Sequence, residues 1–310
     1  MRVPAVNRWL SPADVGRRVS VRRQTPGGLR DSVGILVGWT GAPAGQLQVQ
    51  IKDGTLVDLP ARDVFAARVV PPEVSALALE EIGAVATPPG ERERLGDWEL
   101  RFDGTQIGRT NSVRLVGDPG GDLEDALDYV REWYGRRDAR ALIQTPVPGA
   151  LDDQLVAAGW TPHKESVVLT KQLTGPPAIP DPRPSVDVTR APTPEWLDVA
   201  APDLARGLDR SIARVAHQYF VTNYDDDIPV SVARVALAQP WGVIASVRTL
   251  ALASRRGHAR RLMAAVEATA WSAGSRQLVL QVMTQNAAAL SLYADLGYTP
   301  HHRYRYFLAP

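Results

Sequence analysis

The sequence predicts an α/β protein with two copies of a mixed, mostly antiparallel sheet with flanking helices, preceded by a small all-β barrel. Three observations support this prediction. Short β-type runs separated by turns dominate the first 70 residues. A helix–strand–helix pattern ending in Gly–aromatic–Thr–Pro–His then occurs twice. Near the C-terminus, an Arg-rich turn containing glycine separates a strand-like run from a helix.

The composition is that of a globular protein. The chain has 310 residues, enough for two or three domains, with 45% hydrophobic and 22% charged residues. A net charge of +1 argues against binding of the whole protein to nucleic acid or to an anionic membrane. The absence of cysteine excludes disulfides, thiolate metal sites and a cysteine nucleophile. We expect no metal cofactor.

The sequence also predicts a cytoplasmic location. No apolar run approaches the ~18 residues of a membrane span. The N-terminus lacks the long apolar core of a signal peptide. A soluble bacterial protein is therefore expected, and its preference for Arg over Lys and its many Ala, Pro and Gly residues are typical of a GC-rich genome.

The first predicted domain covers residues 1–72. Its turns include the hairpin signal Lys52-Asp53-Gly54, where Gly adopts positive φ readily, and Pro71-Pro72 marks its end. Several short strands in so few residues favour a small barrel, which resembles an SH3-like barrel. The expected strands are 18–23, 32–40, 46–52, 55–60 and 64–69.

This domain has a basic excess, with ten Lys or Arg against five Asp or Glu. A basic barrel is compatible with nucleic-acid binding. However, no RNA-binding signature or row of stacking aromatic residues accompanies the arginines. Solvated faces, or packing on the acidic middle domain, are the favoured interpretation, and nucleic acid is not an expected partner.

The second predicted domain covers residues 73–175. It is acidic, and its sequence Leu155-Val-Ala-Ala-Gly-Trp-Thr-Pro-His163 aligns with Tyr293-Ala-Asp-Leu-Gly-Tyr-Thr-Pro-His301. Two units are too few for a solenoid, so we interpret them as two copies of one domain type. Expected elements are helices at 73–85, 121–137 and 151–158 and strands at 98–102, 112–116 and 140–145.

A Pro-rich linker, 176–184, leads into the third predicted domain, 185–310. Thr193-Pro194 starts a helix, with Thr as N-cap and Pro at the first position. The apolar run 277–283 predicts a central strand covered on both faces. The remaining expected elements are strands at 185–189, 218–224, 230–238 and 241–249 and helices at 204–215, 258–272 and 286–296.

The turn 254–259, between a strand and a helix, has the properties of an anion site. A helix start offers unpaired backbone N–H groups and the positive end of the helix dipole, and Gly257 allows the backbone to close on a phosphate. In the predicted helix 286–296, Asn286 and Tyr293 are seven residues apart, which places them within about 20° of each other around the axis.

These residues resemble the acetyl-CoA-binding core of a Gcn5-related N-acetyltransferase (GNAT). The family motif Arg/Gln-x-x-Gly-x-Gly/Ala is matched at Gly257 and Ala259, although Ser254 replaces the first residue. The Asn-x-x-Ala-x-x-Leu-Tyr-x-x-x-Gly-Phe/Tyr signature is matched in full from Asn286 to Tyr298. The resemblance implies the acyl-CoA N-acyltransferase fold in tandem, of an actinobacterial type with an N-terminal SH3-like barrel, and acetyl-CoA as co-substrate.

The resemblance also implies roles for particular residues. Backbone groups of Val247, Arg248 and Thr249 would bind pantetheine and the acetyl carbonyl, on a strand that splays from strand 277–283. Asn286 would contact pantetheine, and Tyr293 would donate a proton or hydrogen bond to the CoA sulfur. A core role for Tyr293 is the alternative. The pyrophosphate would be held by Arg255, Arg256, Gly257, His258, Ala259 and Arg260.

The first copy lacks these features. Two aspartates, Asp118 and Asp122, stand in its loop, and Leu155 replaces the tyrosine. We therefore expect a degenerate copy that packs on the active one. The general base stays open, because Arg248 occupies the place of the usual family Glu; Asp225, Asp226, His301 and His302 are the other candidates.

The predicted function is acetyl transfer from acetyl-CoA directly to a primary amine of a small molecule or a protein. The alternative is a non-catalytic acyl-CoA-binding scaffold whose barrel recruits a partner. The off-pattern residues Ser254 and Arg248 motivate that alternative.

Overall fold

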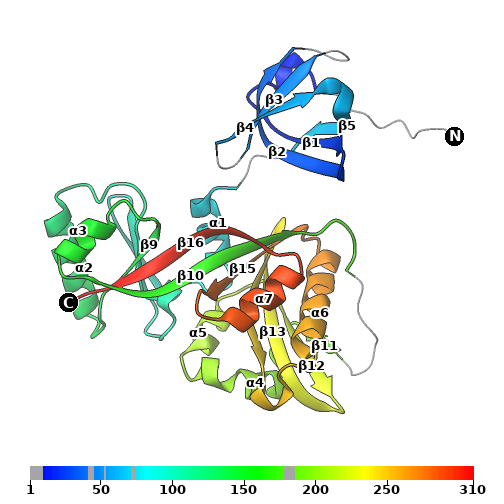
Figure 1. Cartoon of the computed structure of the whole chain (residues 1–310). Helices are drawn as coiled ribbons and strands as arrows, with labels where there is room; N and C mark the ends of the chain where they lie inside the picture. The colour runs from blue at the N-terminus through cyan, green and yellow to red at the C-terminus, as the bar shows by residue number, and fades with distance from the viewer. Residues whose placement is uncertain (1–9, 41–44, 52–53, 71–73, 178–185) are drawn as a thin grey trace. The chain divides into compact units, whose positions relative to one another are not determined.

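The computed structural model describes residues 10–40, 45–51, 54–70, 74–177 and 186–310. The chain forms two compact units, Met1–Ser75 and Ala76–Pro310 (Figure 1). Residues 52 and 53 of the predicted hairpin, Pro71-Pro72 and most of the predicted linker lie outside the described residues. The domain boundaries assigned from the sequence stay a prediction.

The first unit contains a five-stranded antiparallel sheet with the order β4-β3-β2-β1-β5. Alternate side chains such as Val19, Val21 and Leu36 are fully buried in its core. Gly34 is required where β2 meets β3, because a Cβ there would lie 2.1 Å from the carbonyl oxygen of Gln50. The strands are β1 (Arg18–Thr25), β2 (Gly28–Trp39), β3 (Gln46–Ile51), β4 (Leu56–Pro60) and β5 (Val64–Val69), with 3-10 turns η1 (Pro12–Asp14) and η2 (Ala61–Asp63).

The second unit is built on one eleven-stranded sheet with the order β11-β12-β13-β14-β15-β10-β16-β9-β8-β7-β6. Neighbouring strands are antiparallel except for the pairs β8–β9 and β14–β15. Its strands are β6 (Glu91–Leu95), β7 (Trp98–Phe102), β8 (Val113–Arg114), β9 (Leu142–Val147), β10 (Thr161–Gln172), β11 (Val186–Thr189), β12 (Gln218–Asp225), β13 (Ile228–Ala238), β14 (Trp241–Thr249), β15 (Gln277–Met283) and β16 (Thr299–Leu308).

The helices of this unit begin where the sequence provides caps. The Asp122 side chain accepts from the N–H of Glu124, and Thr193 accepts from the N–H of Trp196. The helices are α1 (Ala76–Ala84), α2 (Leu123–Gly135), α3 (Asp152–Ala157), α4 (Pro194–Leu204), α5 (Leu208–Ala213), α6 (His258–Ser272) and α7 (Ala287–Asp295), with 3-10 turns η3 (Gly108–Thr110) and η4 (Ala251–Ala253).

Strand β6 is absent from the sequence prediction. Its residues, Glu-Arg-Glu-Arg-Leu, show little apolar alternation, and the strand lies at the edge of the sheet, paired only with β7. Charged side chains are compatible with such an edge, where they discourage pairing with another chain.

The second unit has a first half, which contains β6 to β10, and a second half, which contains β11 to β16. These two halves exchange their last strands. Strand β10, which ends the first half, pairs with β15 of the second half, and β16 of the second half pairs with β9 of the first. These two strands, each beginning with Thr-Pro-His, also pair antiparallel with each other and run side by side in Figure 1. The second unit is therefore continuous across both halves.

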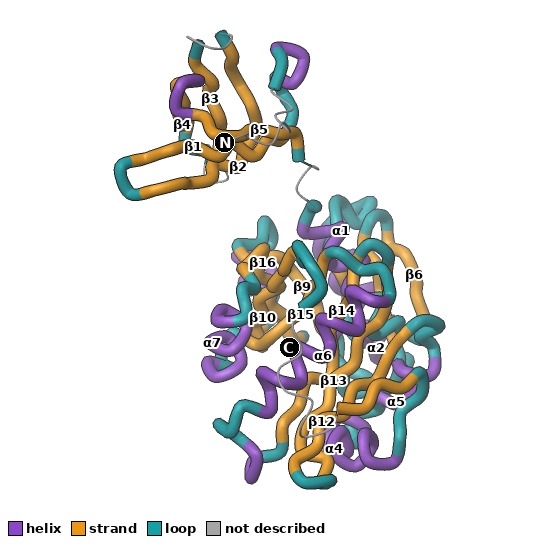
Figure 2. The backbone as a smooth tube through the Cα atoms, turned by 90° about the vertical axis from the view of Figure 1, so that its right-hand side faces the viewer, coloured by secondary structure: helices purple, strands orange, loops and turns teal. Residues whose placement is uncertain are grey.

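Three cores cover this sheet. One lies between α6 and strands that include β15, another surrounds α2, and a third packs α4 and α5 on β12 and β13. Figure 2 shows α4 beside β12 and β13. Leu278, Val279 and Leu280 of β15 are all buried, which confirms the predicted central strand.

Candidate functional site

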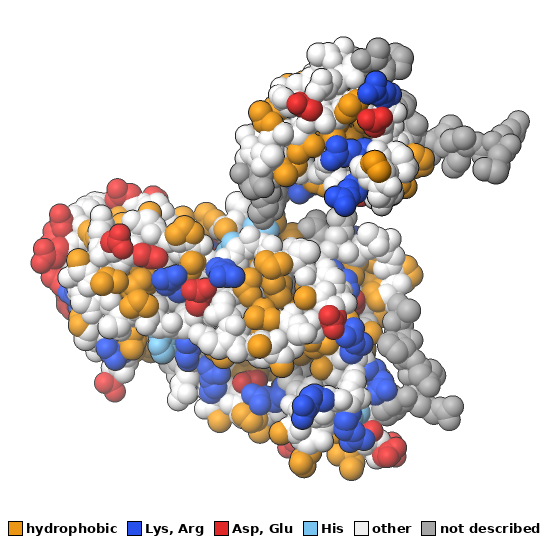
Figure 3. Space-filling view, viewed as in Figure 1, with side chains coloured by type: hydrophobic (Ala, Val, Ile, Leu, Met, Phe, Trp, Pro, Cys, Tyr) orange, Lys and Arg blue, Asp and Glu red, His pale blue; other side chains and the backbone are white. Residues whose placement is uncertain are grey.

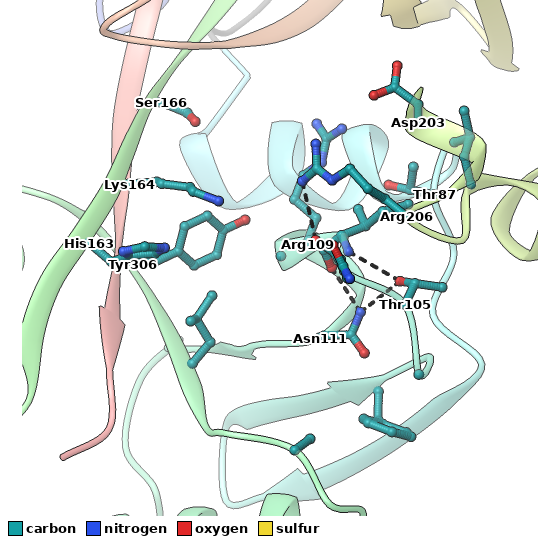
Figure 4. Close-up of a pocket in the computed structure, with 18 of the residues that line it drawn as sticks. Thr87, Thr105, Arg109, Asn111, His163, Lys164, Ser166, Asp203, Arg206 and Tyr306 are labelled. Atoms are coloured by element: carbon teal, nitrogen blue, oxygen red, sulfur yellow. Dashed lines mark hydrogen bonds between the residues drawn. The ribbon is translucent and has the colours of Figure 1, made fainter. Parts of the chain in front are cut away.

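A cleft of about 700 Å³ opens in the second unit between its two halves. Arg109 and Tyr134 line it from the first half, and Arg234 and Ser246 from the second. The exchanged strands contribute Lys164 and Tyr306, whose side chains point into the same space as Arg109 in Figure 4. Both halves of the unit are therefore needed to form this cavity.

The cleft reaches the point where β14 and β15 part. The two strands pair only over Trp241–Ile244 on β14 and Gln277–Leu280 on β15. Beyond that, Ser246 adopts a left-handed φ of 55°, and the register with β13 shifts between Val232 and Arg234. The predicted splay is confirmed, and it frees the backbone edge of Val247, Arg248 and Thr249 from pairing with β15.

The predicted anion loop leads into α6. Arg255 and Gly257 have left-handed φ values of 60° and 84°, and Gly257 is the N-cap of α6. No atom lies within 4 Å of a Cβ built on Gly257, so the space beside it is open. The first N–H groups of α6, including those of His258 and Ala259, thus begin at an open surface with the positive end of the helix dipole.

Asp225 connects this loop to the end of β12. Its carboxylate lies 2.9 Å from Nη2 of Arg256 and 3.6 Å from Nε2 of buried His258. The amide nitrogen of Asn223 donates to Nδ1 of His258 at 3.3 Å, which places the imidazole proton on Nε2. Burial lowers the pKa of His258 below its ordinary value, although Asp225 opposes this. The ring is therefore neutral at pH 7, and Asp225 is a partner of the loop.

Two other predicted donor-site residues make local contacts. Arg260 forms an exposed ion pair with Asp295 of α7 at 3.0 Å. The side chain of Asn286 caps α7 by accepting from the N–H of Ala289 at 3.1 Å. Helix α7 begins at Ala287, so Asn286 is its N-cap and not a helical residue. The prediction that Asn286 and Tyr293 share one face of a helix therefore includes a residue just before that helix.

Tyr293 is buried in the same core as α6, 5.7 Å from the ring of Tyr298 between centroids. Burial raises the pKa of Tyr293 to about 12. Its hydroxyl therefore keeps its proton at neutral pH, as a proton or hydrogen-bond donor requires.

The general-base candidates occupy different environments. Arg248 pairs with Asp203 of α4 at 3.0 Å, and Asp226 forms the β12–β13 hairpin turn with a left-handed φ of 47°. His302 contacts His301 and lies 3.0 Å from the buried carboxylate of Glu80, which also accepts from Gln144. Despite its burial, Glu80 has a lowered pKa because of these hydrogen bonds.

Sequence reasoning missed a histidine in the cleft. His163 lines it, and its pKa is lowered, first by burial and then by the nearby charges of Lys164 and Arg140. A neutral imidazole at pH 7 is able to accept a proton. The aligned Thr-Pro-His sequences drew attention to His163 only as a structural counterpart of His301.

Sequence reasoning also missed Arg234. This arginine lies mid-strand in β13 among buried apolar residues, has no exposed surface, and lines the cleft. Burial, together with the charge of Arg109, lowers the pKa of Arg234 to about 9. A charged residue inside the otherwise uncharged run 230–238 was the signal that could have found it.

Charge is distributed unevenly over the second unit. Acidic side chains gather over α2 and α3 in Figure 3, whereas the cleft is lined by six Lys or Arg and two Asp. The six are Arg109, Arg137, Arg140, Lys164, Arg206 and Arg234. The acidic composition of the first half thus does not extend to the cavity it helps to form.

The cleft adjoins the predicted donor-site residues through β14. Of the residues described, those lining the cavity include Ala245 and Ser246, which directly precede Val247, but not the anion loop or Tyr293. No helix in the described parts of the chain is long and apolar enough to cross a membrane. No three His, Asp or Glu side chains within the described residues are grouped as ligands of a metal.

Comparisons with known proteins agree with this geometry. Residues 75–307 match the family described as probable histone acetyltransferase Rv0428c, C-terminal. A probable histone acetyltransferase of Mycobacterium tuberculosis is 28% identical over 318 residues, covering 95% of each chain. An uncharacterized N-acetyltransferase of Bacillus subtilis, YobR, is 23% identical and covers 73% of this chain and 96% of its own.

Among solved structures, a GCN5-related N-acetyltransferase from Kribbella flavida superposes with a TM-score of 0.57 at 18% identity, covering 76% of this chain and 94% of its own. A functionally unknown protein from Staphylococcus epidermidis gives a TM-score of 0.54 at 11% identity. The first likeness confirms the predicted acyl-CoA N-acyltransferase-like α/β fold with a mixed sheet.

Proposed function

Because the chain belongs to the family described as probable histone acetyltransferase Rv0428c, C-terminal, it is an acyltransferase of the GNAT type, and we propose that it transfers an acetyl group from acetyl-CoA directly to a primary amine. One observation carries the proposal. The cleft opens where β14 and β15 part, immediately before the strand residues that lead to the anion loop. A thioester arm between the strands would reach an acceptor in the cleft from that side.

The loop before α6 is the pyrophosphate site in this proposal. Gly257 and Arg255 hold the backbone in left-handed conformations, and the first N–H groups of α6 supply donors. Arg256, Ala259 and Arg260 complete it. His258 contributes its backbone N–H, since its neutral ring is buried against Asn223.

The acetyl group is held by the freed edge of β14. Backbone groups of Val247, Arg248 and Thr249 bind pantetheine and polarise the acetyl carbonyl, and Asn286 contacts the pantetheine region. The amine nitrogen attacks the carbonyl carbon, and the carbon–sulfur bond then breaks. Tyr293, protonated at neutral pH, donates to the departing sulfur, and the attacking nitrogen passes its proton to water in the cleft.

The two halves are a tandem pair in this proposal, with only the second binding acetyl-CoA. Support comes from their matching parallel contacts, β8 with β9 and β14 with β15, and from their exchanged last strands. In the first half, Asp118 and Asp122 of the equivalent turn oppose a pyrophosphate, and Asp97 adds a third carboxylate there, since its Oδ2 accepts from the N–H of Asp118. The five-stranded first unit is proposed to be an SH3-like barrel.

Calorimetric titration of the intact chain with acetyl-CoA tests the donor site. We expect one molecule bound per chain. Gly257→Val should weaken binding at least tenfold, because a β-branched residue is strained at a φ of 84°. Gly120→Val is the matched control, since Gly120 lies in the corresponding turn of the first half with a φ of 87°, and its added Cβ would lie 3.6 Å from the nearest atom. Equal effects of the two variants, or no binding by the wild-type chain, would refute the assignment.

A further inference from the structure

The side chains that line the cleft carry more positive than negative charge, with six Lys or Arg against two Asp. Of its two aspartates, Asp203 already pairs with Arg248, which does not line the cavity. Among the residues that the structure describes, the Arg206 side chain donates only to the backbone carbonyl of Gln106, at 3.3 Å. Figure 4 shows Lys164 and Arg206 extending toward the middle of the cleft from opposite sides. The walls thus attract an anion and repel a polycation.

Arg234 has an unpaired edge in this wall. Its Nη1 donates to Oε1 of Gln218 at 3.0 Å, and Gln218 is a neutral amide fixed by the carbonyls of Ile212 and Val215. The Nε and Nη2 atoms of Arg234 are buried and have no hydrogen-bond partner in the described parts of the chain. These two atoms form the side of a guanidinium that binds a carboxylate or phosphate through two parallel hydrogen bonds.

Arg109 strengthens the positive potential at this point. It comes from η3 of the first half, and its Nη1 donates to the neutral amide oxygen of Gln281. Its charge is close enough to Arg234 to affect that guanidinium. The charge of Arg109 also helps to lower the pKa of Glu80. However, the carboxylate oxygens of Glu80 are hydrogen-bonded to His302 and Gln144 and not to Arg109.

Burying an unpaired guanidinium beside a second cation is unfavourable for folding, because nothing replaces the water it loses. Such an arrangement is typical of a binding site, where a ligand supplies the missing partner. We propose that Arg234 and Arg109 bind an oxyanion carried by the acceptor, so that the substrate is an amine bearing a carboxylate or phosphate group. Since Arg234 has no exposed surface here, a side chain of the wall rotates away as the anion enters.

This inference rests on the proposed function, and it narrows the acceptor class. The acceptor amine would point toward Ser246 on β14, and its oxyanion toward Arg234 on β13, both of which line the same cavity. Polyamines and Lys/Arg-rich peptides would be disfavoured, since they bring positive charge to a cationic cleft.

The first test measures the anion site alone. The intact chain is saturated with CoA to occupy the pyrophosphate loop and is then titrated with inorganic phosphate and, separately, with malonate, by calorimetry. We expect binding by the wild type, at least tenfold weaker binding by Arg234→Met, and partial recovery by Arg234→Lys. Arg136→Met is the control, because Arg136 is the exposed C-cap residue of α2 and pairs with Glu132. Equal binding by wild type and Arg234→Met would overturn the proposal.

The second test compares matched acceptors by release of CoA thiol: glycine with glycinamide, phosphoethanolamine with ethanolamine, and a Lys-rich peptide as the cationic arm. We expect kcat/KM at least tenfold higher for the anionic member of a pair, with that preference lost in Arg234→Met; which pair responds tells carboxylate from phosphate. Higher kcat/KM for the neutral or cationic acceptors would overturn the anionic class while leaving acetyl transfer intact. Acetyl-CoA binding is measured in parallel, so its loss marks failure of the proposed function itself.

Discussion

The ammonium of Lys171 lies 2.6 Å from Oε2 of Glu267, and this ion pair joins β10 of the first half to α6 of the second. Glu267 is 4% exposed, and the Lys171 nitrogen also lies 5.3 Å from the centre of the Tyr298 ring. The contact therefore holds the exchanged strand against the helix that follows the anion loop.

Glu267→Gln should destabilise the protein by about 3 kcal/mol, because it leaves the Lys171 ammonium partly buried without its counter-charge. Urea unfolding measures the free energy of unfolding. The double variant Lys171→Met with Glu267→Leu should lose less than the single variant, because neither charge then needs a partner. If the free energy of unfolding of Glu267→Gln lies within about 0.5 kcal/mol of wild type, the ion pair does not contribute to stability.

Arg248 and Asp203 should contribute little to stability, although they bridge β14 and α4. Their side chains are 32% and 26% exposed, so solvent screens the attraction. A double-mutant cycle with Arg248→Met and Asp203→Asn should give a coupling energy of about 0.5–1 kcal/mol. A coupling of several kcal/mol would instead identify Arg248 as a buried structural charge.

Tyr293→Phe should lower kcat by roughly 10²- to 10⁴-fold, since it removes the group that donates to the departing sulfur. The ring and its packing on Tyr298 are retained, so acetyl-CoA affinity and thermal stability should change little. Steady-state kinetics with a reactive amine and calorimetry on the same variant check both statements. An unchanged kcat would assign Tyr293 to the core alone.

The variant Tyr293→Phe also tests how ionisation of the Tyr293 hydroxyl changes stability in alkaline solution. The pKa of Tyr293 is raised by burial to about 12, whereas an unfolded tyrosine ionises near 10. Above pH 10 the unfolded chain loses this proton first, so the folded state loses stability, on the order of 1 kcal/mol at pH 11. Tyr293→Phe should lose that much less between pH 9 and pH 11 in urea unfolding. Identical pH dependence in both proteins would contradict the raised pKa.

The elements that the sequence predicted best are those with a strong apolar period. Helix His258–Ser272 and strand Gln277–Met283 have the predicted bounds. The apolar residues of the helix follow a regular helical spacing, and those of the strand form one nearly continuous run. The exchange of β10 and β16 was not predictable from local pattern, since both strands would be equally apolar in either pairing. The contact of Asp225 with Arg256 likewise depends on how distant strands align.

The donor side of the candidate site was easier to predict than the acceptor side. The loop and Tyr293 lie within one contiguous stretch with fixed spacings. The cleft instead collects Arg109, Lys164 and Arg234 from three separate elements and Arg206 from the turn between α4 and α5, so no short motif contains them. Of these, only Arg234 breaks an apolar pattern and is visible as an exception in the sequence.

His258 should make the folded state sensitive to acid. Burial lowers its pKa below the ordinary 6.5, so on acidification the unfolded chain binds this proton before the folded one does. The associated stability is complete above pH 6.5 and is lost as the pH falls through the folded pKa. His258→Gln keeps an oxygen for the Asn223 amide to donate to but has no titration, so it should lose less stability than wild type between pH 7 and pH 5. Urea unfolding of both proteins at pH 7 and pH 5 measures this difference. His163→Gln is measured in parallel, because the pKa of His163 is also lowered and its contribution has to be separated from that of His258. An equal loss in wild type and His258→Gln would mean that His258 charges as readily in the folded chain as in the unfolded one.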